Sequence, residues 1–95
     1  MKNKRKKYKN KMNISGSKIR ELRESKKMSR EFLSNKLLLE EEIDISSQSI
    51  ANIENNARTV SDYELYGLAR VLKVDILILL NDYFENNDNT CLKKF

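Results

Sequence analysis

The sequence predicts an all-α fold, a compact bundle of four to five short helices. Apolar residues recur at helical spacing along most of the chain, and Ser residues that can cap a helix precede several of these segments. The chain has no Pro and only two Gly, so few residues would interrupt a helix. Residues 74–80 (VDILILL) would also suit a buried strand, but no second strand is available to pair with them, so a helix is favoured.

The first two predicted helices lie in the N-terminal half. Residues 15–26 carry Ile19 and Leu22 among charged residues, which indicates a short amphipathic helix with little apolar surface. Ser29 is a candidate N-cap for the second helix. That helix could continue through Leu residues into the acidic residues 40–42, which we interpret as its solvated end.

Residues 46–56 (SSQSIANIENN) carry the most informative pattern. On a helix, Ile50 and Ile53 would face the core, and the opposite face would carry uncharged polar side chains. These are Gln48, Ser49, Asn52 and Asn55. Amides and hydroxyls at this spacing can contact base edges in a major groove, where Gln and Asn pair with adenine. The segment is therefore a candidate recognition helix, and an ordinary solvated helix face is the alternative.

The fourth helix is predicted most firmly. Ser61 and Glu64 have the spacing of a capping box. Apolar residues then follow at i, i+3, i+4 and i+7, namely Leu65, Leu68, Ala69 and Leu72. We expect Tyr63 and Tyr66 to pack at the rim of the core.

Charge divides the chain into three parts. Residues 1–13 hold seven basic residues and no acidic ones, and we interpret them as a disordered arm. This arm is either a solvated tail or a contact to DNA phosphates. The remaining twelve basic and fourteen acidic residues give the rest of the chain a net charge of −2. We assign residues 14–84 to the folded domain and residues 85–95 to a polar tail.

The composition excludes several classes of site. There is no His, and Cys91 is the only Cys, so His-based catalysis, two-cysteine zinc sites and internal disulfides are ruled out. We therefore expect no enzyme activity, no metal, no cofactor and no small-molecule substrate. No apolar run approaches the 18 residues of a membrane span, which favours a cytoplasmic protein without a membrane partner.

Three stretches, in this order, resemble the helix-turn-helix family of phage repressors and Cro proteins, called the XRE family. They are GSKIRELRESKKMSREFLSNKL, ISSQSIANIENNART and LYGLARVLKVDILILL. The resemblance covers residues 16–81. It implies a lambda-repressor-like bundle in which the second and third helices form the DNA-binding pair.

The resemblance also implies roles for individual residues. The base-contacting positions are Ser47, Gln48, Ser49 and Asn52, which follow a cap at Ser46. The phosphate-contacting positions are Arg30, Asn55 and Arg58. Arg23 and Glu54 occupy the positions of an ion pair that joins the first and third helices in the family.

Three features depart from the family pattern. Residues 39–44 (LEEEID) lengthen the second helix or its turn, and we expect their three Glu to point away from DNA because a polyanion would repel them. Asn56 replaces a common Gly, and we expect the turn to survive because Asn tolerates the left-handed conformation. Leu77 and Ile78 replace polar residues, which suggests a dimer surface.

We therefore expect a sequence-specific regulator of transcription, a repressor that binds double-stranded DNA at a pseudo-palindromic operator as a homodimer. An antitoxin or other protein-interaction module is the alternative. It would use residues 74–80 to bind a toxin or a protein antagonist, and DNA binding would then serve autoregulation. A third hypothesis is a nonspecific binder of nucleic acid or anionic membranes that depends on the basic arm.

Overall fold

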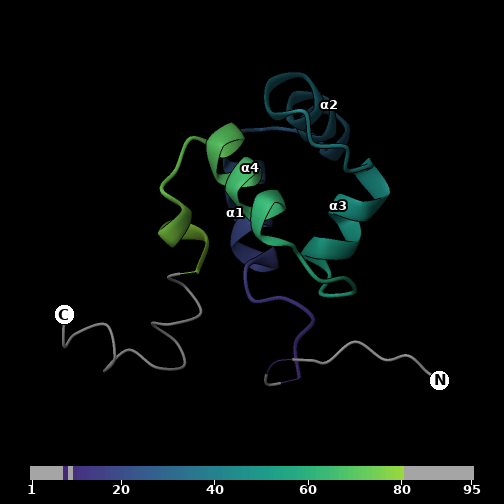
Figure 1. Cartoon of the computed structure of the whole chain (residues 1–95), viewed down its shortest axis with the longest axis vertical. Coiled ribbons are helices and arrows are strands. Elements are labelled where there is room, and N and C mark those ends of the chain that lie inside the picture. The colour runs from purple at the N-terminus through teal and green to yellow at the C-terminus, as the bar shows by residue number, and fades with distance from the viewer. Residues whose placement is uncertain (1–7, 9, 81–95) are drawn as a thin grey trace.

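The computed structural model describes residues 8 and 10–80 of the chain. It contains α1 (Gly16–Ser25), α2 (Arg30–Glu41), α3 (Ser47–Glu54) and α4 (Asp62–Leu72), and residues 76–80 are also helical (Figure 1). In this part of the chain, the only β pairing is an isolated bridge between Tyr8 and Lys11. The all-α prediction is confirmed, and so is a helix rather than a strand at residues 76–80.

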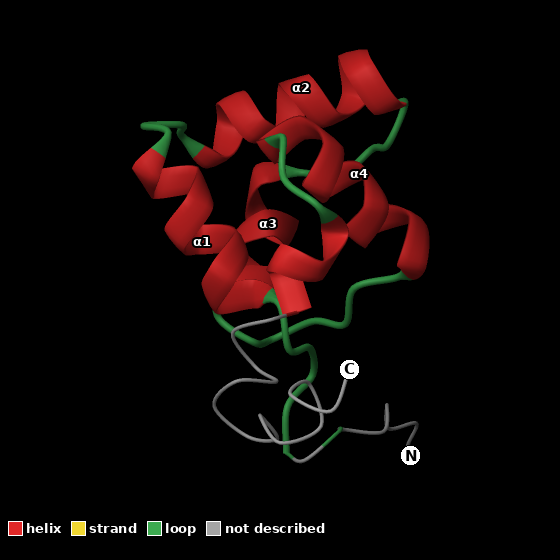
Figure 2. Cartoon of the chain, turned by 90° about the vertical axis from the view of Figure 1, so that its left-hand side faces the viewer, coloured by secondary structure: helices red, strands yellow, loops and turns green. Residues whose placement is uncertain are grey.

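The helices enclose one apolar core. α2 packs against α3 and α4, and α1 packs against the same two helices (Figure 2). Each helix contributes side chains that are almost fully buried, including Ile19 from α1, Leu37 from α2, Ile53 from α3 and Leu68 from α4. Leu79, in the helical residues 76–80, completes the core. Burial of these apolar surfaces is the main force that holds α3 in place.

Three Ser residues cap helices as predicted. Ser29, Ser46 and Ser61 accept hydrogen bonds from backbone N–H groups in the first turns of α2, α3 and α4. The capping box at α4 is complete, since the Glu64 carboxylate also accepts from the Ser61 N–H. The side chain of Ser15 makes no such bond, and the Asn13 amide oxygen instead accepts from the N–H groups of Ser15 and Gly16.

The predicted insertion at residues 39–44 is divided between α2 and the connection to α3. α2 runs to Glu41, and Glu42 then takes a left-handed conformation with φ 57°. Beyond it, Ile43 packs beside Gly67 of α4, where a Cβ would collide with the Ile43 side chain. The connection is therefore anchored to the core by apolar contacts.

Two expectations about exposure were wrong. Glu41 does not belong to a solvated helix end, because its carboxylate bonds the Arg70 guanidinium on α4 at 2.9 Å and is only 15% exposed. Tyr63 and Tyr66 do not pack at the rim of the core, since they are 63% and 55% exposed. The helical period places both rings beside the apolar stripe of α4. It does not indicate whether another element covers them, and in the structure both stay exposed.

The N-terminal boundary also differs from the expected one. The arm was expected to include residues up to 13, whereas the structure attaches Met12 and Asn13 to the domain by hydrogen bonds. Residues 1–7 and 9, the remainder of the expected arm, lie outside the described residues. The expected polar tail and Cys91 also lie outside them.

Candidate DNA-binding interface

α3 separates an apolar face from a polar one. Ile50 and Ile53 are buried, whereas Gln48 and Asn55 are exposed and Asn52 is half-buried. Ser46 fixes the start of the helix, because its hydroxyl accepts from the Ser49 N–H at 3.1 Å. The polar residues singled out from the sequence therefore share one accessible side of an anchored helix.

Gln48 and Asn52 are hydrogen-bonded to each other on this side. The Gln48 amide nitrogen donates to the Asn52 amide oxygen at 3.2 Å, across one turn of α3. No bond to another described residue engages the Gln48 oxygen or the Asn52 nitrogen. The pair thus presents the Gln48 oxygen as an acceptor and the Asn52 amide nitrogen as a donor to a ligand.

A buried carboxylate holds the C-terminal end of α3 on α1 and α2. The Glu54 side chain is fully buried and accepts two bonds from Arg23, at 2.7 and 3.1 Å. The bond to Glu54 is the main cause that raises the pKa of the Arg23 guanidinium. Arg23 also donates to the Met28 carbonyl, so α1, the turn before α2 and α3 meet at this guanidinium.

Arg30 joins the same cluster from the start of α2. Its Nε donates to Glu54 Oε1 at 3.0 Å, and its side chain is 36% exposed. Arg23 also lies 3.7 Å from the Glu24 carboxylate, so the positive charge that this cluster brings to the surface is that of Arg30. No bond to a described residue engages the terminal nitrogens of Arg30, so they can serve an external anion.

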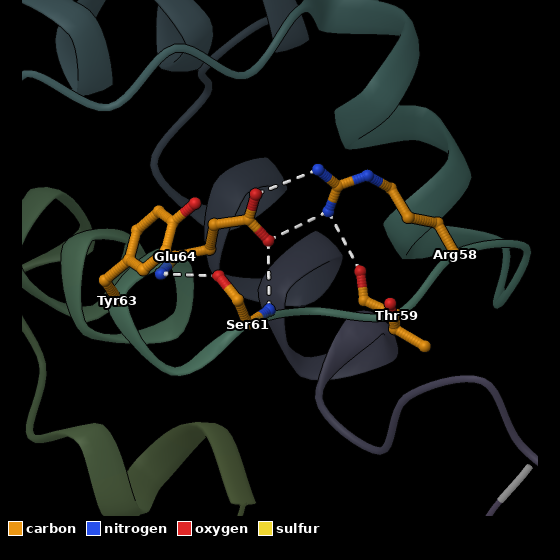
Figure 3. A pocket seen from close by; sticks show the side chains of 5 residues that line it. All are labelled: Arg58, Thr59, Ser61, Tyr63 and Glu64. Carbon is orange, nitrogen blue, oxygen red and sulfur yellow. Dashed lines mark hydrogen bonds and ion pairs between the residues drawn. The ribbon is translucent and has the colours of Figure 1, made fainter. Parts of the chain in front are cut away.

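Arg58, which the resemblance assigns to a phosphate contact, is bonded to other residues of the chain. Its guanidinium forms two bonds with the Glu64 carboxylate, at 3.0 and 2.9 Å, and one with the Thr59 carbonyl (Figure 3). The bond from Arg58 lowers the pKa of Glu64, and the bond from Glu64 raises the pKa of Arg58. To contact a phosphate, Arg58 would have to give up one or both of its hydrogen bonds with Glu64.

The loop around Arg58 forms an open pocket of about 210 Å³. It is lined by Arg58, Thr59, Ser61, Tyr63 and Glu64. Because Arg58 and Glu64 bond each other across the pocket, their charges largely cancel. We therefore interpret this site as part of the support for α4.

Two asparagines form a contact that the sequence did not predict. The Asn56 amide oxygen accepts from the Met12 N–H at 2.7 Å, and its amide nitrogen donates to the Asn13 carbonyl at 3.0 Å. The buried Asn13 side chain donates to the carbonyls of Ile53 and Arg58. We call this set of bonds the Asn13–Asn56 clamp. No helical period or motif indicates a role for Asn13. The only feature of this contact that the sequence predicted is the left-handed conformation of Asn56.

Asn56 itself has φ 65°, so the expected left-handed turn after α3 is present. The turn leaves Asn55, the C-cap of α3, exposed. Leu77 and Ile78 are 61% and 36% exposed. They lie in the helical residues 76–80, on the other side of the bundle from α3 in Figure 1.

Within the described residues, no group of His, Cys, Asp and Glu is arranged to hold a metal ion. The same residues include no helix with the length and apolar character needed to cross a membrane.

A family model described as helix-turn-helix matches residues 19–79, more than half of the chain. The match begins within α1 and extends into the helical residues 76–80. No curated protein and no solved structure matches the chain.

Proposed function

The chain belongs to the XRE-type helix-turn-helix family of DNA-binding transcription regulators, and on this premise we propose that it is a repressor acting as a homodimer. In this proposal α3 enters the major groove of a pseudo-palindromic operator. Two copies would place their α3 helices in successive major grooves, about 34 Å apart. Repression would follow from occlusion of the DNA and needs no cofactor.

The polar face of α3 is the observation that carries the proposal. Gln48 and Asn52 bond each other, and the Gln48 oxygen can still accept while the Asn52 amide nitrogen can still donate. Adenine offers the complementary pair at its major-groove edge, a donor at N6 and an acceptor at N7. The two amides would therefore contact bases as one unit, with Ser47 and Ser49 beside them on the same helix.

Contacts to the DNA backbone would fix the register of α3. Arg30 is suited to this because it is charged, partly exposed and held at its Nε by Glu54. Asn55 lies exposed beyond the end of α3. Arg58 would contribute only by exchanging its bonds with Glu64 for a phosphate.

Selection of bound duplexes from a random DNA pool, at near-physiological salt, tests the proposal. An enriched inverted repeat with half-sites about one helical turn apart is the expected result. Gln48→Ala and Asn52→Ala should each cost about 1–3 kcal/mol at particular bases.

Arg30→Gln provides the matched contrast in that experiment. It should weaken binding to all sequences alike and reduce the dependence of affinity on salt, because phosphate contacts carry no sequence information. A base preference that survives both Gln48→Ala and Asn52→Ala unchanged would refute the assignment of α3.

A second candidate function is supported by the exposure of Leu77 and Ile78. An antitoxin or other interaction module would cover these side chains with a toxin or a protein antagonist. A small toxin gene next to the gene for this chain would favour that function. The purified protein would then be monomeric at concentrations at which it still binds DNA.

A further inference from the structure

The Glu54 carboxylate bonds Arg30 at one edge of its guanidinium and leaves the terminal nitrogens available. Glu54 Oε1 accepts from Arg30 Nε at 3.0 Å, and Arg23 donates to both oxygens of the same carboxylate, at 2.7 and 3.1 Å. Among the described residues, none bonds the terminal nitrogens of Arg30. Because a guanidinium is planar, a partner at Nε restricts the direction in which both terminal nitrogens point.

The other end of the Arg30 side chain starts from a fixed backbone. Arg30 is the first residue of α2, and the hydroxyl of Ser29 caps this helix by accepting from the Phe32 N–H. One residue before Ser29, the Met28 carbonyl accepts from Arg23 at 2.7 Å. The Arg30 side chain is thus held both at its backbone and at Nε, although it is 36% exposed.

A side chain held in this way is suited to bind a phosphate. A free surface Arg gives up rotamer freedom when it makes a contact, and this loss weakens the contact. For Arg30, the bond to the buried Glu54 carboxylate already restricts that freedom in the folded chain. The two terminal nitrogens of a guanidinium also match two oxygens of a phosphate. Arg30 therefore has the features of a two-point contact and not only those of a surface charge.

We propose that Glu54 is a positioning residue for DNA binding, which holds Arg30 so that both of its terminal nitrogens bond one phosphate beside the start of α2. The inference rests on the proposed function, because it requires DNA to lie against α2 and α3. Glu54 is the last residue of α3. The same carboxylate would therefore fix the phosphate contact relative to the helix that is proposed to contact bases, without adding a base preference of its own.

Arg30→Lys in the full chain is the first test, because it keeps the positive charge and does not alter Arg23 or Glu54. Lys ends in a single nitrogen, so it cannot bond Glu54 through one nitrogen and offer two others to a phosphate. Affinity is measured for the operator selected in the experiment above. It is also measured for copies of that operator in which a neutral methylphosphonate replaces one phosphate at a time.

The phosphate bound by Arg30 is the one at which Arg30→Gln removes the effect of this neutralisation. At that position the wild type should bind about tenfold more weakly to the modified operator than to the unmodified one. Arg30→Lys should show a loss of about twofold or less there. On the unmodified operator, its affinity should be close to that of Arg30→Gln.

Glu54 itself is tested by how much Arg30 contributes without it. The contribution is the ratio of affinities between a protein that retains Arg30 and the same protein with Arg30→Gln. We expect this ratio to be about tenfold in the wild-type background and about twofold or less in the Glu54→Gln background. The thermal midpoint, recorded for each variant, shows whether the domain is folded.

Arg23→Lys is the matched control background. It disturbs the same buried pair and leaves the bond from Arg30 Nε to Glu54 available. The contribution of Arg30 should there stay close to its wild-type value. A smaller contribution in both backgrounds would show a general effect of packing and would overturn the role of Glu54.

Two further results would overturn the inference. One is wild-type affinity for Arg30→Lys, because charge alone would then be enough, and this result decides the matter even if Glu54→Gln does not fold. The other is an equal contribution of Arg30 in the wild-type and Glu54→Gln backgrounds. The proposed function has a separate readout, the base preference of Gln48→Ala. If that preference changes while Arg30→Lys binds like the wild type, only the present inference fails.

Discussion

Glu54 is the polar residue that joins α3 to both α1 and α2. Its fully buried carboxylate receives two bonds from Arg23, itself 8% exposed, and one from Arg30. Loss of this charge would leave the Arg23 guanidinium buried without its partner. Truncation of one member of a buried pair commonly costs about 3–5 kcal/mol.

Glu54→Gln should therefore lower the free energy of unfolding by about 2–4 kcal/mol, since the amide retains some of the bonds. Urea unfolding measures the change. Glu40→Gln is the matched control, because Glu40 pairs with Lys36 on the surface of α2. Its removal should leave the urea midpoint nearly unchanged, and equal effects for the two variants would show that Glu54 has no special structural role.

Glu64 should make stability depend on pH. Its bonds with Arg58, and with Ser61 in the capping box, hold its pKa below the ordinary value of 4.5 in the folded chain. A lowered pKa means that the folded state binds protons less readily than the unfolded state. The contribution of Glu64 is therefore complete above about pH 5 and is lost as the pH falls through the lowered pKa.

Glu64→Gln should be less stable than the wild type at pH 7, by about 1–2 kcal/mol, and the difference should shrink below about pH 4.5. Thermal unfolding from pH 7 to pH 3 measures it. A gap that stays constant over this range would mean that Glu64→Gln destabilises by removing a hydrogen-bond acceptor and not by removing a charge.

Sequence reasoning reached some contacts and missed others for a physical reason. Ser61 and Glu64 are three residues apart, so helix geometry alone brings them together. Asn13 is separated by 40 residues from Ile53, and nothing in its neighbourhood indicates that its amide is buried. Arg58 matched a phosphate-contacting position of the family. Glu64 was predicted only as part of the capping box, so its ion pair with Arg58 was not foreseen.

At the level of elements, the start of α3 offers a test that separates stability from recognition. Ser46→Ala removes the acceptor for the Ser49 N–H and should cost about 1 kcal/mol of stability. It should also weaken DNA binding by the folded protein, because the first turn of α3 would fray beside the residues proposed to contact bases.

Ser61→Ala is the matched control for that test. It removes the corresponding cap of α4, which is a different helix from the one that carries the polar face. It should reduce stability to a similar extent and leave the affinity of the folded protein for DNA unchanged. Equal losses of affinity in both variants, measured well below their unfolding temperatures, would indicate a global effect of stability instead.

The connection from α2 to α3 shows where element-level prediction stops. The acidic run at residues 40–42 indicated either a longer helix or a longer turn, and the structure contains both. The end of α2 is set by the left-handed Glu42 and by contacts of Ile43 with α4. Such contacts depend on the packing of the whole bundle, which local spacing does not determine.

For the whole molecule, the all-α class was predictable because each helix carries its own apolar period and most carry their own cap. The boundaries of the domain were harder to predict from the sequence. Charge repulsion among residues 1–13 suggested an arm that ends at residue 13, but the hydrogen bonds of Met12 and Asn13 attach the last part of it. A net charge over a segment does not reveal one buried amide within it.

The proposed function requires the whole molecule to associate with a second copy. Leu77 is 61% exposed beside Ile78, in the helical residues that follow α4. A second copy that covers both side chains would remove apolar surface from water and bring two α3 helices to one operator. Because each copy would also hold the other on the DNA, disruption of this interface should weaken operator binding more than nonspecific binding.

Leu77→Lys should therefore lower the self-association constant at least tenfold, since a charge would be placed in an apolar interface. Sedimentation equilibrium measures this constant, and titration of the operator shows whether binding loses its steepness. Leu39→Lys is the control, because Leu39 on α2 is even more exposed, at 81%, and should tolerate the same charge. If Leu77→Lys kept the wild-type constant, or if Leu39→Lys lowered it equally, residues 77 and 78 would not form the dimer interface. A toxin or protein antagonist would then be the better candidate for this surface.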